Sequence, residues 1–403
     1  MINLSTVSEA LKVLYINPIR EFVNMQADPF AARILATSDN ITGYQKIVRA
    51  VQIGANGGAG AGTETGMLPM AGENLYKQFE STIKNLYGTI SISDKILKSA
   101  TGADAGSFIN ALQRDVDTLI KTLKFSIARQ IYGDGSGVMV KLAAVTNGAT
   151  TLTIDAASIT HNLLPGLTVD VYDLNGTKIS ADGTRILDVD HVTRKVRLDT
   201  ATTGASNAGG YITMQGSKDL ELTGMNAIFD TTKPLYGLDR GEYSWMKPYT
   251  ESLGAISEWG IQNAINTIED TYEVNINHIA AGNTAYKHYM DLMNERRAIN
   301  DVMVLEGGHK ALRFNGMPLV RNKFIAADTI DLYDTSLFTI DQIADWEWLD
   351  DNVHGILQRN ARYPVYEGSI ARYCDLMCRL PGGIGRLSGV GAPAAAAASV
   401  DAE

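Results

Sequence analysis

The sequence predicts a mixed α+β fold, in which a hairpin-like ribbon and one long helix precede an inserted β-rich segment. Three patterns predict this class. Two strand-like arms flank a glycine-rich tip in residues 44–86, and apolar residues recur at helical spacing in residues 107–132. Residues 138–224 consist of short alternating runs separated by turn dipeptides.

The composition is that of a globular protein with a substantial core. The chain has 403 residues, 45% hydrophobic and 20% charged, which allows two or three domains of roughly 100–200 residues each. Because 35 Lys and Arg residues stand against 45 Asp and Glu residues, the net charge is −10 and a chain-wide basic surface for nucleic acid is excluded. Two cysteines, no signal pattern and no run of about 18 apolar residues predict a soluble protein made in a reducing cytoplasm.

The ribbon is predicted from residues 44–53 and 75–83, which flank the tip GANGGAGAGTETGMLPMAG. Leu75 and Phe79 alternate with polar residues, as in a strand with one buried face. A two-stranded ribbon is marginal in water, so we expect this face to lie against other protein, with a second copy of the chain as a candidate. The alternation changes phase near Leu86, which predicts a bulge or a bend out of the ribbon.

The long helix is predicted over residues 107–132. Its apolar residues recur at steps of three and four, as in a helix with one buried face, and Gly133 is expected to end it. The stripe consists of Ile109, Leu112, Val116, Leu119, Ile120, Leu123, Ile127 and Ile131.

The β-rich pattern of residues 138–224 predicts an inserted domain, either a small barrel or a sandwich. We predict the small β-barrel. Runs such as LTVDVYD and KVRLDT are separated by dipeptides such as Asn175-Gly176, which favour tight hairpin turns.

Beyond residue 236, helices are predicted near residues 261–272 and 286–299. A hairpin is predicted over residues 311–325, with Asn-Gly at its turn. The first 43 residues are expected to form an arm with a helical stretch at Leu11, Leu14 and Tyr15, and the low-complexity residues 394–403 to be disordered.

No short motif predicts a catalytic, cofactor or metal site, so we expect a structural protein and not an enzyme. The glycine-rich tip lacks the lysine and the spacing of a P-loop, and GDGSG after the long helix lacks the register of a nucleophile elbow. The six histidines show no metal-ligand spacing, and Cys374 and Cys378 are interpreted as buried free thiols.

One acidic segment gives an alternative of another class, a hydrolase with its site near residues 345–351. Two carboxylates held in one cleft could act as acid and base. The alternation of the segment favours instead a strand with indoles on one face and solvated carboxylates on the other. The residues are Asp345, Trp346, Glu347, Trp348, Asp350 and Asp351.

The order of these elements resembles the major capsid proteins of tailed bacteriophages, whose shared architecture is the Hong Kong 97 fold. The likeness extends over residues 44–389, with the β-rich segment as an extra, and the order of elements is more specific than any single motif. It is carried by GMLPMAGENLYKQFESTIKNLYGTISISDKIL, FINALQRDVDTLIKTLKFSIARQIYGDGSG, RFNGMPLVRNKF, DWEWLDD and ILQRNARYPVYEGSIARYCDLMCRLPGG.

The resemblance implies a domain plan and a contact surface. The plan is an N-terminal arm (1–43), an E-loop ribbon (44–86), a peripheral domain with a spine helix (87–137), a β-rich insertion domain (138–224), a mainly axial domain (225–345), a return to the peripheral domain (346–390) and a disordered tail (391–403). In such proteins the E-loop lies across a neighbouring subunit. The contact residues expected here are Gly57, Gly60, Glu64, Met67, Leu68, Glu73, Leu75, Lys77, Phe79 and Glu80.

The resemblance also implies a function. The chain would self-assemble, through pentamers and hexamers, into the icosahedral shell that encloses the double-stranded DNA of a tailed phage, in the host cytoplasm and then in the virion. The implied partners are a portal protein, a separate scaffolding protein and, as an open alternative, a decoration protein, with no sequence-specific DNA binding and no membrane. Some relatives cross-link through an E-loop lysine, but Met67-Leu68-Pro69 stands here, so we expect a non-covalent shell.

Two alternatives remain open beside the hydrolase. An encapsulin-like nanocompartment shell would share the fold and package protein, and a tail or baseplate protein would have tubular or limited symmetry.

Overall fold

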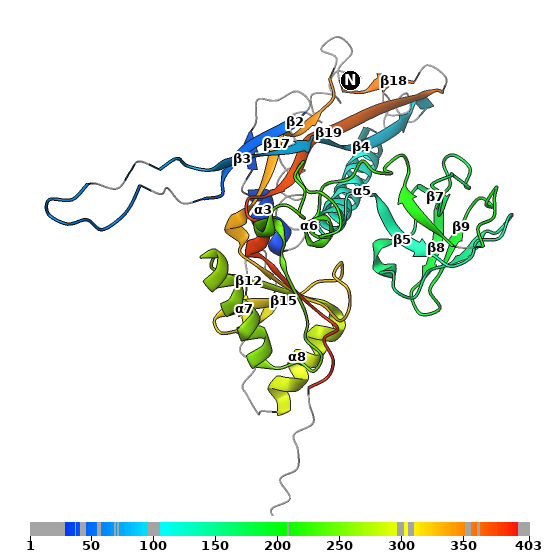
Figure 1. Ribbon diagram of the computed structural model, residues 1–403. Helices are drawn as coiled ribbons and strands as arrows, with labels where there is room; N and C mark the ends of the chain where they lie inside the picture. Colours follow the sequence, from blue (N-terminus) through cyan, green and yellow to red (C-terminus); the bar gives the residue numbers. More distant parts are fainter. Residues whose placement is uncertain are drawn as a thin grey trace, which may run out of the picture.

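The structure, a computed structural model, contains two principal sheets, with a ribbon projecting on one side and a β-rich unit on the other (Figure 1). The elements come from every part of the chain, and the long sheet and the seven-stranded sheet are each built from segments far apart in sequence. The residues that the structure describes are 29–36, 38–40, 46–54, 58–67, 70, 72–95, 105–207, 209–295, 302–304, 310–350, 356–360 and 363–393.

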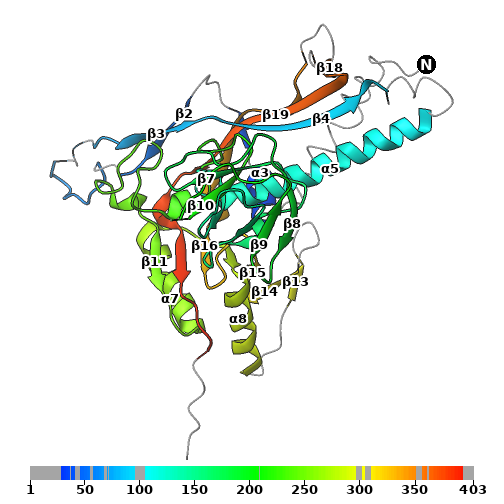
Figure 2. The ribbon, with the colours of Figure 1, turned by 90° about the vertical axis from the view of Figure 1, so that its right-hand side faces the viewer.

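The five-stranded long sheet carries the spine helix along one face (Figure 2). The helix, α5 (Ala105–Ile131), confirms the predicted helix, and Val116, Ile120 and Leu123 of its stripe are buried. A Cβ at Gly88 of the sheet would lie 2.9 Å from Leu119 Cδ1, so glycine lets this helix pack directly on the strand. The strands are β1 (Ser38–Asn40), β17 (Phe338–Trp348), β19 (Val365–Cys378), β18 (Gln358–Arg359) and β4 (Lys84–Ser93).

The seven-stranded sheet is covered by two helices, α7 (Glu258–Tyr272) and α8 (Asn283–Glu295). Ser257 caps α7 by accepting a hydrogen bond from the Gly260 amide. The predicted hairpin is confirmed, since Asn315 and Gly316 both have positive φ, as a tight two-residue turn requires. In spatial order the strands are β11 (Tyr249–Ser252), β20 (Gly385–Ser388), β16 (Ile330–Tyr333), β12 (His278–Ala281), β15 (Met317–Arg321), β14 (Lys310–Phe314) and β13 (Val302–Val304).

The β-rich unit is not the closed barrel that we predicted. It consists of two three-stranded sheets, whose edges are joined by the single bridges Leu142–Ile154 and Thr168–Arg185 and a few flanking backbone hydrogen bonds and not by a continuous ladder. The ladder does not continue because β6 has three residues and β8 changes register against β9 after Ile186. The sheets are β5 (Val138–Leu142), β10 (Gly210–Met214) and β7 (Val169–Asp173), and β6 (Thr151–Thr153), β9 (Lys195–Leu198) and β8 (Ile186–Asp190).

The two connections of this unit to the body lie side by side. The amide of Asp219, on the outgoing segment, donates to the carbonyl of Ser136 on the incoming segment at 2.9 Å. Gly137 has a φ of 79°, and a Cβ there would lie 2.3 Å from the Ser217 carbonyl oxygen, so this crossing requires glycine. The outgoing segment then enters the short helix α6 (Met225–Phe229).

A short N-terminal helix, α3 (Pro29–Ala36), joins the two sheets and was missed by sequence reasoning. Pro29 begins this helix, and proline is well suited to the first turn because the amide it lacks would have no partner there. The buried Phe30 ring stacks on Tyr333 of the seven-stranded sheet at 4.4 Å between centroids and meets Phe338 of the long sheet at 5.3 Å. The helical stretch predicted at Leu11, Leu14 and Tyr15, and the tail at residues 394–403, lie outside the described residues.

The chain crosses between the sheets more than once. β17 enters the long sheet at Phe338, and after β19 the chain returns to the seven-stranded sheet through β20. No helix within the described ranges combines the length and the apolarity that crossing a membrane requires.

Replacing Phe30 tests whether α3 holds the sheets together. Phe30→Ala should lower the free energy of unfolding by about 3–5 kcal/mol, because it opens a cavity among four rings, those of Tyr132, His278, Tyr333 and Phe338. Arg114→Gln, on the exposed side of α5, should change it by less than about 0.5 kcal/mol. Urea denaturation followed by tryptophan fluorescence measures both, and equal losses would contradict this role of Phe30.

Candidate assembly surface

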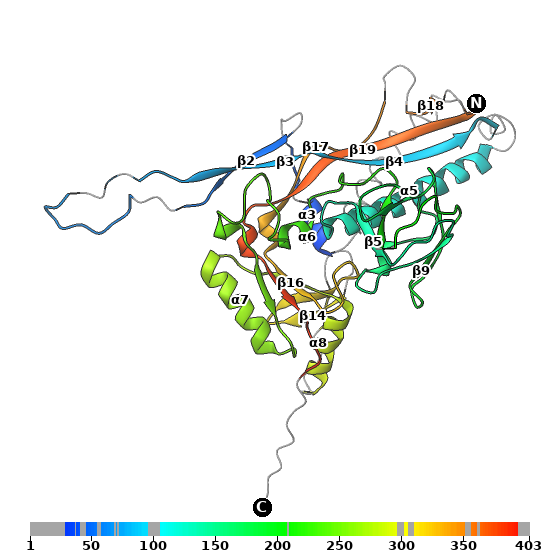
Figure 3. The same cartoon turned by 45° about the vertical axis from the view of Figure 1, so that its right-hand side comes forward.

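The predicted ribbon is confirmed and extends well beyond the body of the molecule (Figure 3). It consists of β2 (Lys46–Gln52) and β3 (Tyr76–Thr82), paired antiparallel, with Ile53 donating to the Leu75 carbonyl at 2.9 Å beyond their ends. Toward the tip the side chains are open to solvent, and Met67 is 93% exposed. The predicted phase change is also confirmed, because β4 begins at Lys84 and pairs with β19 instead of β2.

At its base, the apolar face of the ribbon is covered by the chain itself. Phe79 is fully buried, with its ring stacked on Trp245 at 5.7 Å and tilted against Tyr236 at 5.2 Å between centroids. Phe79 therefore attaches the ribbon to the body of its own chain. We had predicted that it would contact a neighbouring copy, and its burial corrects that prediction. Leu75, closer to the tip, is 55% exposed and has no such cover.

The first polar anchor of the ribbon is a two-pronged ion pair. Arg49 on β2 reaches Asp341 on β17 with Nε–Oδ2 at 2.6 Å and Nη2–Oδ1 at 2.7 Å. The Asp341 side chain is 0% exposed, so the guanidinium supplies the charge that a buried carboxylate needs. This geometry fixes both the position and the direction of β2 on the long sheet.

The second anchor lies directly beside the first, because Asp375 on β19 is the cross-strand partner of Asp341. Asp375 is buried and accepts hydrogen bonds from the hydroxyl of Ser81 on β3 and from the amide and the hydroxyl of Thr223, at 2.8 and 2.9 Å. Burial raises the pKa of Asp375, although these donors act in the opposite direction. Each strand of the ribbon is thus attached to one buried carboxylate of the long sheet.

The charged residues along the ribbon divide into paired and open positions. Lys46 and Glu80 form an exposed ion pair at 2.8 Å, and Lys77 Nζ lies 5.0 Å from the Tyr243 ring centroid. Hydrogen bonding to Tyr243 raises the pKa of Lys77. Of the contact residues that we predicted, Gly57 and Leu68 lie outside the described residues, while Gly60, Glu64, Met67, Glu73 and Leu75 are exposed.

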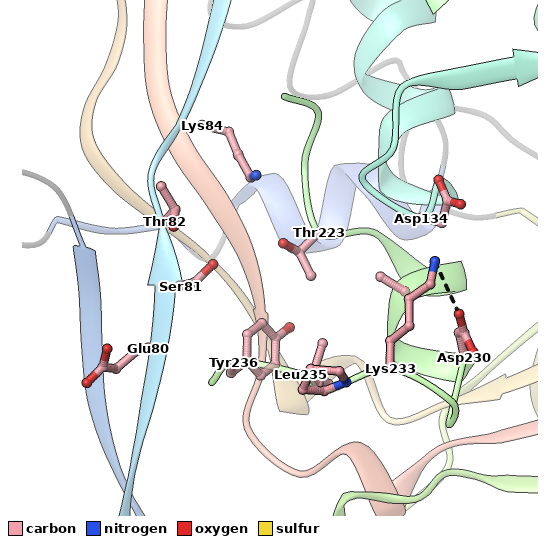
Figure 4. A pocket seen from close by; sticks show the side chains of 12 residues that line it. Glu80, Ser81, Thr82, Lys84, Asp134, Thr223, Asp230, Lys233, Leu235 and Tyr236 are labelled. Atoms are coloured by element: carbon pink, nitrogen blue, oxygen red, sulfur yellow. Dashed lines mark ion pairs between the residues drawn. The ribbon is translucent and has the colours of Figure 1, made fainter. Parts of the chain in front are cut away.

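A cavity of about 250 Å³ opens where the ribbon joins the body (Figure 4). Lys84 points into it from the start of β4, and Lys233 pairs with Asp230 at 3.6 Å on the far side. Asp134 at its rim accepts the Ser136 amide at 3.0 Å, which makes the predicted GDGSG segment a turn. The lining mixes both signs of charge, and its Ser81 and Thr223 hydroxyls are held by the buried Asp375 as part of the second ribbon anchor.

The acidic tryptophan segment forms the end of β17, as predicted, and not a cleft. Trp346 and Trp348 are buried on one face, whereas Glu347 is exposed on the other. Asp345 Oδ1 lies 3.7 Å from Nε of the buried Arg372. This ion pair accounts for the position of the Asp345 carboxylate without a catalytic role. Asp351 lies outside the described residues.

The thiols and histidines that the structure describes are not grouped into a reactive site. Burial raises the pKa of Cys374 and of Cys378 to about 12, so both stay protonated and weakly nucleophilic, and their predicted burial is confirmed. Burial, and then the charge of Arg33, lowers the pKa of His278 to about 3. Among the described residues, no three His, Cys, Asp or Glu side chains are grouped closely enough to hold a metal ion.

Comparison with known proteins supports the fold. No family model matches the sequence, and no curated protein sequence matches it significantly. The chain is similar to the cyanophage A-1(L) capsid asymmetric unit, with a TM-score of 0.54 and 9% identity over 91% of this chain and 94% of that chain. It therefore has a Hong Kong 97-like capsid fold of mixed α+β class, as the resemblance predicted.

Two other solved structures are similar at lower scores. The capsid of a native GTA particle matches with a TM-score of 0.46 and 11% identity, over 89% of this chain and 90% of that chain. The holo-SrpI encapsulin complex from Synechococcus elongatus PCC 7942 matches with a TM-score of 0.43 and 7% identity, over 79% and 78%.

Breaking the ion pair should release the ribbon. Arg49→Met leaves Asp341 buried without its charge partner, so we expect the free energy of unfolding to fall by about 3–5 kcal/mol and β2 amides to exchange faster. The matched control Lys46→Met removes an exposed pair and should cost less than about 1 kcal/mol. Hydrogen exchange with mass spectrometry reads out the ribbon; equal protection in the two variants would count against the anchor.

The raised pKa of Asp375 predicts a pH dependence. A carboxyl whose folded pKa lies above its unfolded value of about 3.9 contributes stability below that value and loses it as the pH rises through the folded pKa. Asp375→Asn should therefore flatten this fall while keeping hydrogen-bond partners for Ser81 and Thr223. Asp375→Ala should be about 1–3 kcal/mol less stable at every pH, since it orphans their buried polar groups.

Urea denaturation of the wild type and both variants between pH 4 and pH 8 measures these profiles. A profile of Asp375→Asn that runs parallel to the wild type would show that Asp375 does not titrate in this range.

Proposed function

We propose that this protein is the major capsid protein of a tailed bacteriophage, which self-assembles into the icosahedral head shell around double-stranded DNA. The observation that carries the proposal is the ribbon, which is fixed at its base by two buried carboxylates yet projects an open tip away from any core of its own. A rigid, outward arm of this kind gains its stabilising surface only from a neighbouring copy. In this role the chain is a structural protein and not an enzyme.

The contacts with the neighbour are non-covalent in this proposal. The exposed tip residues Gly60, Glu64, Met67, Glu73 and Leu75 provide the contact, together with Gly57 and Leu68. Lys77 and Glu80 contribute less, since both already have partners within the chain. Each contact is modest, but every copy in a closed shell makes several at once, so they act multivalently.

The β-rich unit serves as an insertion domain, and the seven-stranded sheet with its helices as the axial domain of each pentamer and hexamer. The other partners are a portal protein, a separate scaffolding protein and, at the outer surface, a decoration protein. The net charge of −10 suits a wall that encloses DNA without sequence-specific binding.

Electron microscopy of the expressed protein tests the proposal. We expect icosahedral shells, and shells from infected cells should hold nuclease-resistant DNA and give a single band of about 43.5 kDa after boiling in SDS. Protein cargo in place of DNA would identify an encapsulin-like compartment, tubes a tail protein, and a ladder of multimers a cross-linked shell. A monomer that turns over a substrate would instead support the hydrolase.

Deleting residues 57–66 tests the role of the ribbon tip. The variant should keep the circular dichroism and melting temperature of the wild-type monomer, because residues 58–66, the described part of the deletion, belong to neither core. We expect it to assemble poorly at protein concentrations at which the wild type forms shells. Normal shells from this deletion would refute the contact.

A further inference from the structure

Charge is segregated around the seven-stranded sheet. Residues 248–286, which include α7, contain no Lys or Arg, whereas residues 307–327, which include β14 and β15, contain no Asp or Glu. The carboxylates of the first stretch are Glu251, Glu258, Glu269, Asp270 and Glu273. The cations of the second are Lys310, Arg313, Arg321 and Lys323.

The fold places α7 and the strands β14 and β15 toward opposite ends of the sheet. α7 packs over β20, next to the edge strand β11, where its Ile268 occupies the space that a side chain at Gly385 would need. β15 and β14 lie next to the edge strand β13 at the far end (Figure 2). Asp270 and Glu273 are exposed at the first end, and Arg313 and Arg321 near the second.

The outer face of α7 has the composition of a contact surface. Trp259 is 77% exposed, and Asn263, Asn266 and Asp270 follow it at helical spacing on the solvent side. This side carries no lysine and little charge, while the opposite side buries Ile261 and Ile268. Exposed tryptophan in a lysine-free, polar surround is typical of the centre of protein interfaces.

The ribbon identifies the side on which the partner lies. In all three views the ribbon extends to the side of the molecule that carries α7, and Figure 2 shows β13 and β14 on the opposite side (Figures 1, 2 and 3). A copy that meets α7 is therefore the copy toward which the ribbon reaches. Because the two ends of the sheet carry opposite charge, the contact joins unlike surfaces, and a contact of this head-to-tail kind forms a ring when the rotation between successive copies closes.

We propose that the α7 end of one copy packs against the β13–β14 end of the next copy. Trp259 lies at the centre of this contact, and the carboxylates of Asp270 and Glu273 face the guanidinium groups of Arg313 and Arg321. The inference rests on the proposed shell function and specifies the surface through which the copies of one ring meet.

Charge reversal tests the pairing. Asp270→Lys with Glu273→Lys, or Arg313→Glu with Arg321→Glu, should each raise the protein concentration needed for shell assembly by about tenfold or more in low salt. Combining all four substitutions should restore assembly to within about threefold of the wild type, because opposite charges face each other again. Trp259→Ala should raise the threshold by about tenfold at any salt concentration.

The matched control reverses two exposed charges on the β-rich unit, Asp188→Lys with Lys195→Glu, and should leave the threshold unchanged. Circular dichroism and light scattering measure monomer folding and assembly in every variant. Wild-type shells with no effect of either reversal, or with no restoration in the combined variant, would overturn this pairing and leave the shell function intact. A wild type that stays monomeric under all conditions would overturn both.

Discussion

The architecture depends on two adjacent carboxylates in the middle of the long sheet. Asp341 and Asp375 face each other across β17 and β19, and each holds one strand of the ribbon, through Arg49 and through Ser81. Burying two such groups side by side is costly unless each finds its own partners. The ribbon supplies those partners. The same ion pair and hydrogen bonds therefore attach the ribbon and stabilise the sheet beneath it.

A cluster of aromatic rings fixes the junction between the two sheets. α3 contributes Phe30 to a cluster of aromatic rings drawn from the seven-stranded sheet and the long sheet. Because rigid rings fill this junction, the position of one sheet fixes that of the other. The ribbon and the outer face of α7 are thereby held in a constant relation, which allows one neighbouring molecule to engage both.

Local patterns were enough to predict the ribbon arms, α5, the Asn315-Gly316 hairpin and the tryptophan strand, because each is encoded by the periodicity or the turn chemistry of a short segment. The anchors were not predictable, since Arg49 and Asp341 are 292 residues apart and neither stands out in its own strand. For the same reason Phe79 was assigned to a neighbour: alternation reveals a buried face but not what buries it. The prediction of a closed barrel was wrong because strand lengths and register shifts, and not alternation, decide whether a sheet closes into a barrel.

The hydrogen bond between Asp219 and Ser136, where the two connecting segments meet, has a consequence for how the chain can evolve. The two segments that connect the β-rich unit to the body run side by side, so a polypeptide with closely spaced termini can take the place of this unit in the chain. The pair of connecting segments at Ser136 and Asp219 is therefore a suitable place to insert another domain. It offers a position for displaying a foreign domain on every copy of the protein, at a spacing that the protein itself determines.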